Sequence, residues 1–315
     1  MKPALSVVFF TTVSGAGWGM LFWLGVLDAA SFLPDGRWFG PVAVGVAMAL
    51  ASAGLLASTR HLGRPERAWR ALSQWRSSWL SREGVAALAA YLPAIGFAAA
   101  WLQVGPFAPL TRALGLLGAV VGCATVVCTA MIYRCLTPVR QWHNGFVLPT
   151  YLLLAAYSGA ACLSASAAFW QPGPTRLAAS LAAFAGIAGA ACKRAYWRFI
   201  DRGHAASTIE SATGLGTLGA VRMLEAPHTE ENYLMREMGF RIARKHAGKL
   251  RRVTFLLGFA APVMLLAIGA ALGGIVGQVI LPLAALCVLA GLYVERWLFF
   301  AQATHTVTLY YGRPD

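Results

Sequence analysis

The chain has 315 residues, of which 58% are hydrophobic and only 12% are charged, and its formal net charge is +14. Soluble domains carry about 25% charged residues, so this composition excludes an ordinary soluble protein. The apolar residues form long blocks, whereas a transmembrane β-barrel has short segments of alternating hydrophobicity. We therefore predict an all-α, polytopic membrane protein, built as a bundle of eight transmembrane helices.

Eight apolar blocks are each about long enough for a membrane-spanning helix, which needs about 20 apolar residues. The first block continues to about residue 30, which is too long for the apolar part of a secretory signal, so we predict a retained helix. All eight lie in a single membrane domain, residues 1–315. The predicted helices cover about 6–30, 38–58, 84–103, 113–133, 146–169, 177–192, 253–275 and 278–300.

One long segment, 193–252, separates the sixth and seventh predicted helices. It is too short for an enzyme domain of ordinary size, so we predict a cap over the bundle or a docking surface. A helix is expected from Asn232 to Arg252. The run Gly214-Leu215-Gly216-Thr217-Leu218-Gly219 has the spacing of a dinucleotide-binding loop, but that function needs a preceding strand and a βαβ unit. We predict a tight turn there instead.

The basic residues are unevenly placed along the predicted bundle. Counting helices from the N-terminus puts 23 of the 26 Lys and Arg residues on the side that carries both termini, and only Arg37, Arg112 and Arg176 on the other. Cytoplasmic loops are enriched in Lys and Arg, so we predict that both termini and the basic side face the cytoplasm. Docking of an acidic partner protein would also favour a basic face.

Ionisable residues are scarce within the predicted helices, where they are costly and usually functional. This scarcity disfavours an ion pump. All six His residues lie at helix ends or in loops, whereas membrane haem b usually takes axial His ligands from the helical core. The six Cys residues form no CxxC pair. We therefore predict no haem and no metal site. A small-molecule transporter remains an alternative, although it predicts internal repeats and polar midplane groups that are not evident.

The connection between the second and third predicted helices carries the clearest candidate site. His61 lies at the end of one helix and Glu83 at the start of the next, so the two side chains can meet at one depth. Reduction of a quinone consumes two electrons and two protons. A His can donate or accept a hydrogen bond near neutral pH, and a partly buried Glu can relay protons. A purely structural His–Glu or Arg–Glu pair at the helix ends is the other interpretation.

Short polar motifs recur in order along almost the whole chain. They are His61-Leu62-Gly63, Ser78-Trp79-Leu80-Ser81-Arg82-Glu83, Met131-Ile132-Tyr133, Arg140-Gln141-Trp142-His143-Asn144, Pro227-His228-Thr229, Arg236-Glu237-Met238-Gly239, Ala243-Arg244-Lys245-His246-Ala247 and Glu295-Arg296-Trp297-Leu298-Phe299-Phe300. Together they resemble the DmsC-type family, the membrane anchor subunits of dimethyl-sulfoxide-reductase-like molybdoenzymes.

The resemblance implies a three-subunit complex in which a molybdopterin catalytic subunit passes electrons through a four-cluster ferredoxin-like iron–sulfur subunit. The anchor itself has no haem and no catalytic residue, and it binds a quinone (ubiquinone or menaquinone) beside the nearest cluster. The family's His and Glu at that site match His61 and Glu83, and its motif glycine matches Gly63. We also assign Ser81, and Arg64, which directly follows Gly63, to the quinone and proton-relay site.

The basic loops are expected to dock the iron–sulfur subunit, with Arg140, His143, Arg244 and Lys245 as the candidate contacts. Other expected contacts are with membrane lipid, and none with nucleic acid. Exported sulfoxide reductases dock on the periplasmic side, but the basic face here is expected in the cytoplasm. This resembles the cytoplasm-facing sulfite dehydrogenases of the bacterial inner membrane, so we favour sulfite oxidation coupled to quinone reduction. The anchor of a dimethyl-sulfoxide or related oxyanion reductase that oxidises quinol is the alternative.

Overall fold

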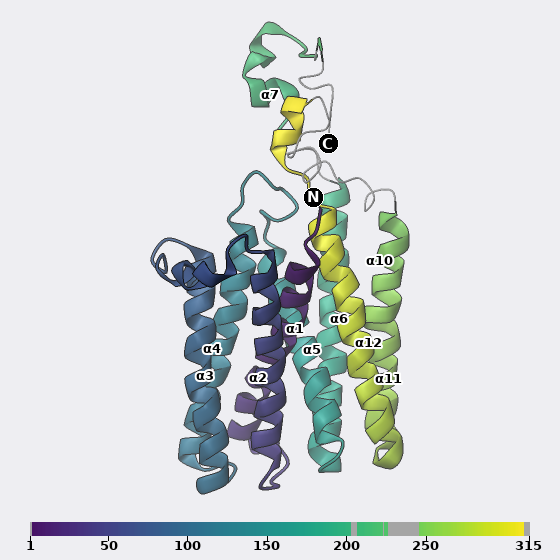
Figure 1. Ribbon diagram of the computed structural model, residues 1–315. Coiled ribbons are helices and arrows are strands. Elements are labelled where there is room, and N and C mark those ends of the chain that lie inside the picture. Colours follow the sequence, from purple (N-terminus) through teal and green to yellow (C-terminus); the bar gives the residue numbers. More distant parts are fainter. Residues whose placement is uncertain (1, 203–206, 223, 226–245, 312–315) are drawn as a thin grey trace.

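The computed structural model describes residues 2–202, 207–222, 224–225 and 246–311, and Figure 1 shows a bundle of roughly parallel and antiparallel helices. Within these residues, eight helices are long and apolar enough to span a membrane, and there is no strand. The predicted all-α polytopic fold is therefore confirmed. The spans are α1 (Leu5–Ala29), α2 (Phe39–Ser58), α3 (Trp79–Gln103), α4 (Pro109–Arg134), α5 (Val147–Ala167), α6 (Pro172–Arg202), Ala247–Leu272 and α12 (Gly274–Ala301).

Two helices extend beyond their predicted ends. The third span begins at Trp79 rather than at residue 84, which places Ser81 and Glu83 inside the helix. The sixth span continues to Arg202 rather than to residue 192. Its buried face continues at helical spacing through Lys193 and beyond, so the start of the predicted loop 193–252 is in fact helix. Most of the helix predicted to end at Arg252 lies outside the described residues.

The seventh span is composite. It consists of α10 (Ala247–Phe255), the π-helical turn η4 (Leu256–Ala260) and α11 (Ala261–Leu272). The hydroxyl of Tyr157, on α5, donates a hydrogen bond of 3.0 Å to the carbonyl of Gly258 in the π-helical turn. Such turns change the register of a helix and often occur at functional sites.

Helices α1 and α5 occupy the centre of the bundle. In each, more than half of the most apolar stretch is buried, 61% in α1 and 72% in α5. Helix α1 packs against α2, α4, α5 and α12, while α6 packs against α5 and α11. In Figure 1, α3 and α4 stand at one side of the bundle and α10 and α11 at the other.

Small residues allow the close helix approaches that hold this bundle together. A Cβ added at Gly159 on α5 would lie 2.1 Å from the carbonyl carbon of Gly19 on α1, and one added at Gly291 would lie 2.1 Å from the Cα atom of Gly258. Because lipid offers helices little hydrophobic drive to associate, such backbone contact supplies much of the packing energy.

The connections expected on the basic side gather at one end of the bundle, together with the chain start (Figure 1). They include the short helices η1 (Thr59–His61), η2 (Pro65–Leu72), α7 (Ile209–Thr213), η3 (Leu215–Leu218) and η5 (Thr306–Tyr311). We call this the docking end. Gly214 ends α7 with a φ of +71°, in the left-handed region that favours glycine. In the glycine-rich run, the predicted turn is confined to Gly214, and the next four residues form η3.

Candidate functional site

Glu83 is buried near the docking end of the bundle. It lies just after the first turn of α3, which starts after the extended residue Ser78, and its residue surface is 4% exposed. The hydroxyl of Thr129, on α4, donates a hydrogen bond to the Glu83 carboxylate. A carboxylate taken out of water needs such partners, so the α3–α4 contact both shields and orients this group.

The segment η2 folds over the start of α3 and shields Glu83 from the docking end. The Ser81 hydroxyl, buried in the first turn of α3, donates a hydrogen bond to the carbonyl of Ala71 at the end of η2. A Cβ at Gly84 would lie 2.8 Å from the Leu72 side chain, so the absence of a side chain makes room for Leu72. In this stretch Glu83 therefore supplies the buried carboxylate, while Ser81 and Gly84 contact the end of η2.

Arg82 holds the residues that follow η2 against the start of α3. Its guanidinium donates hydrogen bonds to the carbonyls of Trp75, at 3.0 Å, and Arg76, at 2.7 Å. The same group lies 4.3 Å from the ring centre of Trp79. Cation–π contacts of this kind stabilise an exposed arginine by about 0.5–1 kcal/mol. Arg82 thus holds the end of the η2 connection against the helix that carries Glu83.

The remaining residues of the predicted quinone site lie in the connection itself. His61 is the last residue of η1, and its side chain lies outside the described atoms. Gly63 and Arg64 are exposed between η1 and η2. The short helix η2 contacts both η1 and α3, so it links the two predicted motifs. Direct contact between His61 and Glu83 stays a prediction.

The predicted docking residues lie partly on an open basic surface. Arg140 lies 5.0 Å from the Phe199 ring centre and, with Arg198 and Arg202, lines a shallow depression at the docking end. His143 is exposed, and its Nδ1 is 2.7 Å from the carbonyl oxygen of Arg134. The other two candidates, Arg244 and Lys245, lie outside the described residues.

The loop between α4 and α5 is bound to the end of the chain. Trp142 is buried, and its indole N–H donates a 3.0 Å hydrogen bond to the carbonyl of Phe299. The Gln141 amide pairs with Thr304 through bonds of 2.9 and 3.2 Å. Burial lowers the pKa of the nearby His305, which favours the neutral imidazole at neutral pH. These contacts make Trp142 part of the buried core.

A buried cluster of three charged side chains lies beside this loop, and sequence analysis did not identify it as a site. Lys193 on α6 forms an ion pair with Glu295 on α12, and the Nε atom of Arg296 lies 3.2 Å from the other Glu295 oxygen. Residue exposures are 1%, 0% and 3%. The cluster contains one more positive charge than negative charge. Buried charges in a membrane protein are usually functional.

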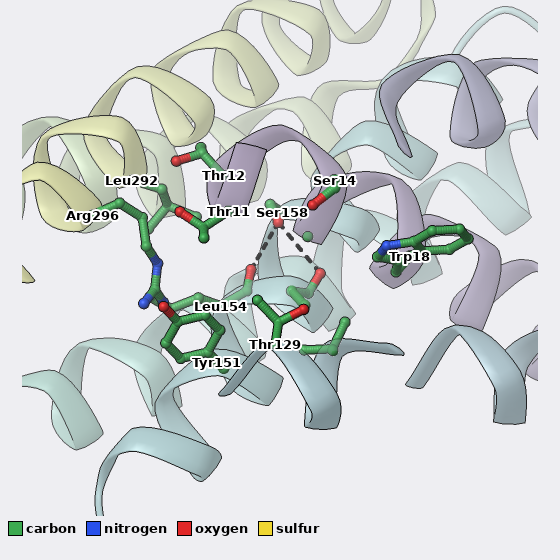
Figure 2. Close-up of a pocket in the computed structure, with 13 residues that line it drawn as sticks. Thr11, Thr12, Ser14, Trp18, Thr129, Tyr151, Leu154, Ser158, Leu292 and Arg296 are labelled. Carbon is green, nitrogen blue, oxygen red and sulfur yellow. Dashed lines mark hydrogen bonds between the residues drawn. The ribbon is translucent and has the colours of Figure 1, made fainter. Parts of the chain in front are cut away.

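A small cavity lies between Arg296 of this cluster and Thr129, the hydrogen-bond partner of Glu83. The cavity lies between α1, α4, α5 and α12, and Figure 2 shows the guanidinium of Arg296 and the side chains of Tyr151, Thr129 and Ser158 around it. Thr129 also donates the hydrogen bond to Glu83. The cavity has a volume of about 20 Å³. Arg296 thus lines the cavity directly, and Glu83 adjoins it through Thr129.

Comparison with known proteins identifies the class to which this membrane bundle belongs. The family model of the DMSO reductase anchor subunit (DmsC) matches residues 1–312, so the chain belongs to that family. The chain is therefore a multi-pass membrane anchor subunit of an oxidoreductase complex, as its motifs indicated. It is 37% identical to one of the subunits of a sulfite dehydrogenase from Allochromatium vinosum, over an alignment of 328 positions that covers 99% of each chain.

Proposed function

We propose that this anchor binds quinone and exchanges electrons between a partner iron–sulfur cluster and the membrane quinone pool. The observation that carries the proposal is the buried Glu83 at the docking end, covered by η2 and hydrogen-bonded to Thr129. A carboxyl group that is shielded from bulk water but connected to polar groups is suited to transfer protons to a reacting oxygen. The predicted His61 would lie on the other side of the quinone head group.

The electrons would come from outside the chain. In this proposal a molybdopterin protein oxidises sulfite, and a four-cluster ferredoxin-like protein transfers the electrons to the docking end. The name of the Allochromatium relative supports sulfite as the substrate. The basic surface around Arg140, Arg198 and Arg202 supports docking of an acidic protein face. By the positive-inside rule, this end would face the cytoplasm of a bacterial inner membrane.

Substitution of Glu83 tests the proposal directly. In the complex purified through this chain, Glu83→Gln keeps the size of the side chain but removes its capacity to transfer a proton. We expect sulfite-dependent reduction of decylubiquinone to fall at least about 100-fold, the usual contribution of a general acid or base. Glu66→Gln, on the exposed surface of η2, is the matched control and should retain the rate. Equal rates in Glu83→Gln and the wild type would refute the site.

The family description favours one second candidate, the anchor of a dimethyl-sulfoxide or related oxyanion reductase that oxidises quinol. Both candidates use the same quinone site but opposite electron flow. Supplying the purified complex with sulfite and decylubiquinone, or with dimethyl sulfoxide and decylubiquinol, separates them. Turnover of only the second pair would select the reductase.

A further inference from the structure

We propose that the cavity between α1, α4, α5 and α12 holds ordered water, and that this water connects Lys193, Glu295 and Arg296 to Glu83 as the route by which protons reach the quinone site. The inference rests on the proposed function, because it assigns the source of the protons that quinone reduction consumes. It gives a role to a charged cluster that a simple anchor does not need.

The size and lining of the cavity fit bound water. A water molecule needs about 10–15 Å³ of space for its centre and two to four polar partners, and the cavity offers about 20 Å³. Hydroxyl groups line it from three helices, whereas an empty cavity in a protein is typically apolar. The hydroxyl groups are those of Thr11, Thr12, Ser14, Thr129, Tyr151 and Ser158.

Two buried polar atoms at the cavity have no hydrogen bond of good geometry to a described residue, although the two side chains interact with each other. They are the Tyr151 hydroxyl oxygen and the Nη1 atom of Arg296. The guanidinium carbon lies 3.9 Å from the centre of the Tyr151 ring, and Figure 2 shows the guanidinium beside the hydroxyl end of that ring. A buried unsatisfied polar group costs about 1–3 kcal/mol. Water in the cavity would satisfy both.

The Thr129 hydroxyl can link cavity water to Glu83 through hydrogen bonds. Its hydroxyl lies within hydrogen-bond reach of the Glu83 carboxylate and is 3.0 Å from the carbonyl oxygen of Thr125. A hydroxyl has one proton and two lone pairs, so it can donate to the carbonyl when Glu83 is protonated and to the carboxylate when it is not. In both states it can accept a hydrogen bond from cavity water.

Lys193, on the side of the cluster away from the cavity, lies near the groove at the docking end. The Lys193 ammonium lies 5.5 Å from the Trp197 ring centre, and Arg251 lies 5.4 Å from the same ring. Arg251 pairs with the half-exposed Asp201 at 2.6 Å, beside an open groove of about 480 Å³. The Trp197 ring therefore lies next to both Lys193 and the groove.

The proposed reaction balances in electrons and in protons. One quinone takes two electrons from the reduced iron–sulfur partner and two protons from water at the docking end, and forms one quinol. In the proposed route, water that enters beside Trp197 exchanges protons with Lys193 and Glu295, and cavity water passes them through Thr129 to Glu83. Arg296 stays protonated and orients the water.

A pair of isosteric variants on α4 tests the route in the assembled complex. Thr129→Val removes the hydroxyl between the cavity and Glu83, while Thr125→Val, one turn away and bonded only within α4 among the described residues, is the matched control. The complex is reduced with stoichiometric dithionite and mixed with decylubiquinone in H₂O or D₂O. The absorbance of the clusters gives the reoxidation rate, and a titration gives the affinity for decylubiquinone.

We expect Thr129→Val to slow reoxidation at least about tenfold and to increase the solvent isotope effect, with unchanged quinone affinity. Thr125→Val should match the wild type. A wild-type rate and isotope effect in Thr129→Val would overturn the proposed route. If wild-type complex neither binds nor reduces decylubiquinone, the proposed function itself is wrong.

A cryo-electron microscopy map of the wild-type complex gives an independent readout, which does not depend on whether a variant assembles. Density for water within hydrogen-bond reach of Tyr151 and Arg296 is expected. A dry cavity in a map that resolves other buried waters would overturn the proposal even if the anchor reduces quinone.

Discussion

Removing the negative charge of the buried cluster should destabilise the anchor more than removing one of its positive charges. Glu295→Gln leaves Lys193 and Arg296 buried as two uncompensated positive charges, since both pair with Glu295. Loss of one partner from a buried pair costs about 3–5 kcal/mol. Lys193→Met instead leaves Glu295 and Arg296 as a neutral pair, and it should cost less.

The double substitution Lys193→Met with Glu295→Gln restores the wild-type excess of one positive charge. It should therefore be more stable than Glu295→Gln alone, which is a coupling between the two sites. Thermal unfolding of the purified complex measures all three variants. We expect Glu295→Gln to lower the melting midpoint by roughly 6 °C or more, with partial recovery in the double variant. If Lys193→Met were the least stable of the three, the charge account would be refuted.

Three further predictions concern packing around the site. Gly159→Ala should reduce the yield of assembled complex in detergent, because its Cβ would meet the backbone of α1, whereas Gly45→Ala has open space around it and should assemble normally. Trp142→Phe leaves the Phe299 carbonyl without its donor, and we expect a loss of about 1 kcal/mol, measured as a lower melting midpoint. Ser81→Ala removes the hydroxyl that binds η2, and should speed proteolysis of residues 62–78 in limited digestion without changing the yield.

Most of the membrane architecture followed from the sequence, because long apolar blocks are a local property. The eight spans were predicted and are present within the described residues. The third and sixth spans are longer than the sequence predicts. In the sixth, a charged residue usually ends an apolar block, so the sequence places Lys193 beyond the helix. Its partner, Glu295, lies about a hundred positions away in the sequence, so the ion pair that lets the helix continue was not visible in local patterns.

The candidate site was predictable only in part. The position of Glu83 near the docking end followed from its place at a helix start. Its partner Thr129 and the cavity did not, because they depend on how α1, α4, α5 and α12 pack. One signal was present: Lys193, Tyr196 and Trp197 lie at helical spacing on the buried face of α6. The proposed contribution of His61 remains a prediction for experiment.

The central claim is that this anchor binds quinone within a molybdopterin and iron–sulfur complex. The most direct test is the native mass and cofactor content of the complex purified gently through a tag on this chain. We predict two further proteins that carry molybdopterin and iron–sulfur clusters, with quinone extracted from the anchor. Recovery of this chain alone, with no redox partner and no quinone, would contradict the account.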